Sequence, residues 1–232
     1  TSVLTAIWGG IILIFVGILL ARPMLEMMGT PEDVINLSVL YMRIYFVGMP
    51  AFMMYNFGAA ILRAIGDTKR PLYFLTLSGV VNVVLNLFFV IVFHMGVAGV
   101  ALATIISQAI SAFLIILCLM KMDGPCHLDF KHLKFHPEQL KSMLRIGLPA
   151  GLQGAIFSIS NVLIQSSVNS FGSQVMAGNT AAGNIEGFVY NSMNAVYQTS
   201  LSFTSQNMGA KKFDRINKIL FQCLLVVTAI GL

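Results

Sequence analysis

Charged residues are scarce in this chain, and their scarcity excludes an ordinary soluble domain. Only 10% of the 232 residues are Asp, Glu, Lys or Arg, whereas soluble domains carry about a quarter. The hydrophobic fraction is 57% and the mean hydropathy is +0.83. A chain with so much apolar and so little charged surface indicates an integral membrane protein of the all-α class.

Cysteine is also rare, and its spacing is typical of neither a disulfide framework nor a zinc site. The three cysteines are Cys118, Cys126 and Cys223. Three histidines between residues 127 and 136 follow Cys126, but they fit no structural zinc pattern. The apolar segments also lack the convergent nucleophile and base, or metal set, of an enzyme. We therefore expect no metal, no cofactor and no catalytic residue.

Apolar runs long enough to cross a bilayer recur along the whole chain, which predicts a polytopic helical bundle. The chain begins on Thr1 rather than a methionine and ends inside an apolar run, so we interpret it as a fragment. The predicted spans are 3–21, 34–62, 73–93, 97–120, 144–170 and 175–203, with an unfinished one at 216–232.

The basic residues lie almost entirely in alternate connections between these spans. On one side, three successive connections hold three, five and four basic residues. The other side holds the remaining two of the 14. By the positive-inside rule the basic side is cytoplasmic, so Thr1 is expected on the cytoplasmic side. The net charge of +5 is then a topology signal, and we expect no nucleic-acid partner.

One acid breaks this partition, because Glu186 lies inside the predicted span 175–203, which holds no Lys, Arg or His. It stands 11 residues, about 16 Å, from the outer end of that helix, close to the bilayer centre. Intramembrane acids are costly and typically mark an ion or proton path. Glu186 is therefore the candidate for cation coupling.

Polar residues at helical spacing accompany this acid and predict one polar face on each of two neighbouring helices. Such faces are stable in a membrane only against protein or a water-filled cavity. Helix–helix hydrogen bonding and lining of a cavity both explain the individual amides. The candidates for a substrate or cation cavity are Gln153, Asn161, Gln165, Asn179, Tyr190, Asn191, Asn194, Tyr197 and Gln198.

Three further sequence patterns are explained by helix packing or by helix boundaries. Asn82 and Asn86 in the third span, with the Thr104–Ser111 polar residues in the fourth, predict interhelical packing. Pro137 followed by Glu138 predicts a helix start, and residues 138–145 are predicted to be a short amphipathic surface helix. Pro50 and Pro149 lie inside predicted spans, where either packing or a hinge explains them.

Four segments stand out in order along the chain: LRAIGDTKRPLYF (62–74), GVAGVALATIISQ (96–108), RIGLPAGLQGAIFSISNVLIQ (145–165) and SFTSQNMGAKKFDRI (202–216). Together they resemble the multidrug and toxic compound extrusion (MATE) transporters. The resemblance implies part of a two-lobe, twelve-helix transporter, namely spans three to eight and the start of nine. Residues 1–121 then belong to the N-terminal lobe with four spans, 122–143 to the cytoplasmic inter-lobe loop with its amphipathic helix, and 144–232 to the C-terminal lobe.

The same resemblance implies a secondary antiporter that exports amphipathic or cationic organic compounds in exchange for sodium ions or protons. We expect a monomer in the bilayer of the bacterial inner membrane. Some family members carry an acid in the span that matches 144–170, where this chain has Phe157, Ser158 and Asn161. Because this chain has no acid in that span, we assign the cation-coupling role to Glu186 by its location and chemistry and not by a matching motif. A lipid-linked oligosaccharide flippase of the same superfamily is the alternative, and the absence of Lys or Arg deep in any span argues against it.

Overall fold

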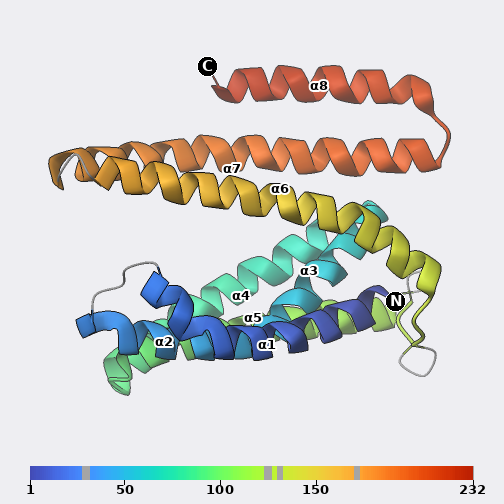
Figure 1. The fold of residues 1–232 in the computed structure, drawn as a ribbon. Coiled ribbons are helices and arrows are strands. Elements are labelled where there is room, and N and C mark those ends of the chain that lie inside the picture. The colour runs from blue at the N-terminus through green and yellow to red at the C-terminus, as the bar shows by residue number, and fades with distance from the viewer. Residues whose placement is uncertain (28–31, 123–126, 130–132, 170–172, 232) are drawn as a thin grey trace. The chain divides into compact units, whose positions relative to one another are not determined.

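The computed structural model of the chain describes residues 1–27, 32–122, 127–129, 133–169 and 173–231. These ranges contain eight α-helices, one π-helical segment and no strand, which confirms the predicted all-α class (Figure 1). The chain divides into two compact units, Thr1–Leu140 and Lys141–Leu232, and each is described by itself.

The first unit is a bundle of five α-helices around a small, tightly packed core. Its helices are α1 (Ser2–Met27), α2 (Glu32–Val47), α3 (Met49–Ala64), α4 (Lys69–Leu87) with the π-helical η1 (Phe88–Val92), and α5 (Gly96–Lys121). Helix α5 packs against α2, α3 and α4, and α1 packs against α2 and α3. Leu62, Ile115 and Leu119 are the largest fully buried side chains, so the core lies between α3 and α5.

Among the described residues, three helices are long and apolar enough to cross a membrane. They are Ser2–Met27, Lys69–Val92 and Gly96–Lys121. The pair Val34–Val47 and Met49–Ala64 adds a fourth span if it is counted as one helix with a bend. These four segments coincide with the four spans predicted between residues 3 and 120.

The second predicted span is bent rather than straight. Its two halves, α2 and α3, meet at Gly48 with an angle of 47°. The Gly48 N–H donates to the Tyr45 carbonyl at 3.0 Å, and Pro50 occupies the first turn of α3. Because Pro50 has no N–H, the Phe46 carbonyl loses its helical partner, which favours a break at this point.

Close packing on both sides holds this bend. A Cβ atom added to Gly48 would lie 2.8 Å from the Ile105 side chain of α5. A Cβ on Gly10 of α1 would lie 2.5 Å from the Pro50 Cα. Gly17, two turns further along the same face of α1, lies against the Phe46 ring. We call the segment Phe46–Pro50 the elbow, and it lies between α1 and α5.

Polar side chains join α4 to α5, which confirms the predicted interhelical packing. Asn82 Nδ2 donates to Ser107 Oγ at 3.3 Å and to Thr104 Oγ1 at 3.5 Å, and Ser78 Oγ donates to the Ser107 carbonyl at 2.6 Å. Asn86 Nδ2 continues the chain of hydrogen bonds by donating to Asn82 Oδ1 at 3.0 Å. Within the described ranges, two buried side-chain oxygens accept no hydrogen bond, namely Asn86 Oδ1 and Gln108 Oε1.

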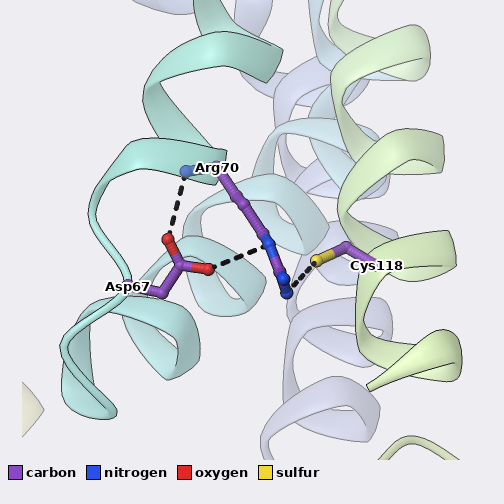
Figure 2. A network of polar contacts seen from close by, with 3 residues as sticks. All are labelled: Asp67, Arg70 and Cys118. Atoms are coloured by element: carbon purple, nitrogen blue, oxygen red, sulfur yellow. Dashed lines mark hydrogen bonds and ion pairs between the residues drawn. The ribbon is translucent and has the colours of Figure 1, made fainter.

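The turn between α3 and α4 is tied to α5 by a small polar network (Figure 2). Asp67 accepts from the Arg70 main-chain N–H at 3.2 Å, and its other oxygen pairs with Arg70 Nε at 3.2 Å. The same guanidinium donates from Nη1 to Cys118 Sγ at 3.7 Å. Gly66 has φ +89°, a conformation that side-chain-bearing residues rarely adopt. This basic connection therefore contributes packing as well as charge.

The second unit contains three long helices: α6 (Pro137–Asn169), which begins just before it, α7 (Ser173–Gly209) and α8 (Phe213–Gly231). Helix α6 begins at Pro137 with Glu138 in its first turn, as the sequence predicted. The segment 138–145, predicted as a short amphipathic surface helix that leads into the next span, forms one continuous helix with that span, which Pro149 does not break. Helices α7 and α8 form an antiparallel hairpin (Figure 1).

Candidate functional site

A large cavity of about 1100 Å³ lies within the second unit. Helix α6 contributes Gln153, Phe157 and Ser160 to its wall, and α7 contributes a longer stretch from Tyr190 to Leu201. The space is open on one side, and α8 adds apolar residues such as Leu220 and Leu224 to its wall. The cavity has the size of a pocket for a drug-sized organic molecule.

Five of the predicted cavity residues line this space. They are Gln153, Tyr190, Asn194, Tyr197 and Gln198. Their side chains supply two phenol groups and three amides, while no Lys, Arg, Asp, Glu or His is among the lining residues. Aromatic faces with a few neutral hydrogen-bonding groups can hold an amphipathic molecule in many orientations.

The remaining candidates lie elsewhere on the same two helices. Asn161 on α6 and Asn179 and Asn191 on α7 are exposed and are not among the lining residues. Gln165 belongs to α6, but its side chain lies outside the described part of the structure. Whether these four residues contact a substrate or a cation stays a prediction.

Glu186 lies next to the cavity rather than in its wall. It is exposed on α7, four residues before Tyr190, the first α7 residue of the lining. Residues four apart share one face of a helix and are about 6 Å apart along its axis. The carboxylate therefore extends the row of Tyr190, Asn194 and Tyr197 by one turn, and a bound cation at one end of this row would lie close to a molecule in the cavity.

Sequence reasoning missed the apolar wall of the cavity. Leu220, Leu224 and Val227 recur at three- and four-residue steps on α8, and this stripe was visible in the sequence as part of the unfinished last span. It also missed the two buried oxygens of Asn86 and Gln108, since no pattern in one sequence shows which amide oxygen accepts no hydrogen bond. Among the described residues, no group of three His, Cys, Asp or Glu side chains could hold a metal ion.

The first unit contains helices that can cross a membrane, and the second contains a large neutral, aromatic cavity next to one carboxylate. Both features are typical of one class, that of membrane transport proteins. The MatE family model matches residues 1–88 and 149–232. Since these segments make up more than half of the chain, the chain belongs to the MATE family of transporters.

Curated relatives support the same assignment. "Probable multidrug resistance protein YoeA" of Bacillus subtilis (strain 168) is 31% identical over 218 residues, which cover 91% of this chain and 47% of YoeA. "Probable multidrug resistance protein YpnP" of the same organism is 33% identical over 200 residues, or 86% of this chain and 44% of YpnP. The chain thus spans about half the length of the curated relatives it matches.

Solved structures show the same fold. A MOP superfamily transporter from Pyrococcus furiosus superposes on this chain with a TM-score of 0.90 at 23% identity. The superposition covers 98% of this chain and 51% of that protein. At this identity the likeness concerns the fold alone, and it agrees with the predicted part of a MATE-type helical bundle.

Proposed function

We propose that this chain forms part of a secondary active antiporter that exports amphipathic or cationic organic compounds in exchange for sodium ions or protons. The observation that carries the proposal is the cavity of about 1100 Å³ with Glu186 one turn from its first α7 residue. The names of YoeA and YpnP, as multidrug resistance proteins, support the substrate class.

Glu186 has a distinct role in this proposal. A carboxylate that holds a coupling cation is neutralised by it, whereas an empty carboxylate attracts a cationic substrate. The two ligands then bind in competition, and each is released when the cavity faces the other side of the membrane. Phenol and amide groups of the cavity wall hold the organic part of the substrate.

The membrane potential supplies enough energy for such an exchange. Inward movement of one monovalent cation across 100 mV provides roughly 2.3 kcal/mol, which sustains a concentration ratio of some tens-fold. We further propose a monomer in the bacterial inner membrane, with Thr1 on the cytoplasmic side. The lipid-linked oligosaccharide flippase is not favoured, because a pyrophosphate needs cationic partners and no Lys or Arg lines the cavity.

The test uses the full-length parent protein and efflux of a fluorescent organic cation from cells. Glu186→Gln keeps the size and polarity of the side chain but removes the charge, so we expect efflux to fall by at least about tenfold. Glu138→Gln is the control, since this acid lies in the first turn of α6 and has no part in the cavity. Varying sodium and pH independently identifies the coupling ion.

Two outcomes would contradict the proposal. Normal efflux by the Glu186→Gln protein at equal expression would show that the carboxylate is a packing residue and that coupling lies elsewhere. A loss of efflux in both variants would point to a general effect of surface charge rather than to a role of this acid.

A further inference from the structure

A second groove of about 670 Å³ lies along the hairpin of α7 and α8. On α7 its wall is a stripe at helical spacing that runs from Val196 through Phe203 to Asn207. On α8 the wall runs from Arg215 through Ile219 to Val226. Most of these residues differ from those of the substrate cavity, because the two spaces lie on different faces of the hairpin.

The chemistry of the groove changes along its length. The end next to the turn carries Arg215 and Lys218 of α8 and the amide Asn207 of α7, whereas the far end is formed by Val196 and Val226. The turn itself adds two more cations, Lys211 and Lys212. The groove is therefore basic at one end and mostly apolar at the other, where Thr199 and Gln222 add two neutral polar groups.

The length of the groove matches one leaflet of a bilayer. On both walls the end residues are 11 positions apart, from Val196 to Asn207 and from Arg215 to Val226, which is about 16 Å of helix. The hydrocarbon of one leaflet is about 15 Å thick, half of the roughly 30 Å core. A lipid with its phosphate at the basic end would thus place its acyl chain along the apolar part.

The two cations of the groove are Arg215 and Lys218. Within the part of the chain that the structure describes, neither the Arg215 nor the Lys218 side chain makes an ion pair, and no acid is among the lining residues. A cationic drug would be repelled here, in contrast to the cavity beside Glu186. A soluble anion would use the basic end but leave the apolar half unfilled.

We propose that this groove binds an anionic phospholipid of the cytoplasmic leaflet. The phosphate contacts Arg215 and Lys218, and one acyl chain lies along Phe203, Ile219 and Val226. Basic pockets between helices at the cytoplasmic side are known to bind anionic headgroups, and juxtamembrane cations add to the attraction. The site is independent of the transport substrate, since a lipid that stays bound supports the hairpin without being exported.

The experiment measures lipid binding to the full-length parent protein by native mass spectrometry, with phosphatidylglycerol, phosphatidylcholine or inorganic phosphate added. The double variant Arg215→Gln/Lys218→Gln removes the two cations that line the groove. Lys211→Gln/Lys212→Gln is the matched control, because it removes the same charge from the adjacent turn, at residues outside the lining. A third variant, Val226→Trp, fills the apolar end without changing the charge.

We expect wild type and the control to prefer phosphatidylglycerol over phosphatidylcholine. The Arg215/Lys218 variant is expected to lose roughly tenfold or more in phosphatidylglycerol affinity. Val226→Trp should also weaken lipid binding while leaving efflux of the organic cation intact. Transport and lipid binding are separate readouts, so the failure of one proposal is distinguishable from the failure of the other.

Three results would overturn the proposal. Equal losses in the two double variants would mean that the whole turn attracts lipid through its charge without a specific groove. Competition by inorganic phosphate at equal affinity would assign the basic end to a soluble anion. No phosphatidylglycerol preference in the wild-type protein would mean that a protein segment, rather than a lipid, fills the groove.

Discussion

Single glycines of α1 decide how closely the elbow approaches this helix. Gly17 faces the Phe46 ring with no space for a Cβ atom, whereas nothing lies within 4 Å of a Cβ placed on Gly9. Both residues are in the interior of α1, so their intrinsic effect on the helix is the same. A difference in stability between the alanine variants of these two glycines therefore measures packing alone.

We therefore predict that Gly17→Ala destabilises the protein by about 1–3 kcal/mol, the usual cost of overpacking. Gly9→Ala should be neutral or stabilise by up to about 1 kcal/mol, because Ala is the better helix former and meets no neighbour. Thermal unfolding of the full-length parent in detergent checks both variants. Equal stability of the two proteins would contradict the close contact with Phe46.

The bend of the second span is a property of a whole element and its neighbours. Pro50 removes one helical hydrogen bond, but the elbow is also enclosed by Gly10 on α1 and Ile105 on α5. Around Pro149, a Cβ on Gly147, Gly151 or Gly154 would meet nothing within 4 Å in the part of the chain that the structure describes, and α6 continues through this proline. Packing therefore decides which proline accompanies a bend.

On this basis Pro50→Ala is expected to keep the bend. Ala retains the Cα and Cβ atoms that lie nearest to Gly10, and we predict a loss of only about 0.4–1 kcal/mol, chiefly through the unfolded chain. Distances between spin labels on α2 and α3 of the full-length parent check the angle. A straightened span in this variant would show that the proline, rather than the packing, causes the bend.

The orientation of the whole molecule depends on its charge distribution. Thr68 lies in a connection with three basic residues nearby, and Glu26 lies at the opposite end of the predicted spans. Single cysteines at these positions, with Cys118, Cys126 and Cys223 replaced by Ser, report the topology of the full-length parent. We predict that a membrane-impermeant maleimide labels Glu26→Cys in intact cells, and Thr68→Cys only after permeabilisation. The reverse labelling pattern would show that the protein has the opposite orientation in the membrane.

Much of the fold was predictable, because the signals for membrane helices are local. The ends of α5 and the start of α6 at Pro137 follow from apolar length and from helix-start residues. The family, too, was recognisable from four short motifs. The π-helical end of α4 was not predicted, and the effect of Pro149 on α6 was left open between packing and a hinge. Both depend on which hydrogen bonds the backbone makes, and residue types alone do not specify these.

The sequence by itself determined the class of the protein, the four membrane helices between residues 3 and 120 and the candidate acid, because hydropathy and charge act over one helix at a time. The tertiary structure alone decided which side chains share a space. It brought Gln153 of α6 together with Tyr190 and Asn194 of α7 in one cavity, and left Glu186 one turn outside the wall. Helical spacing defines the face of a helix, but only the packing of neighbouring helices determines what that face meets.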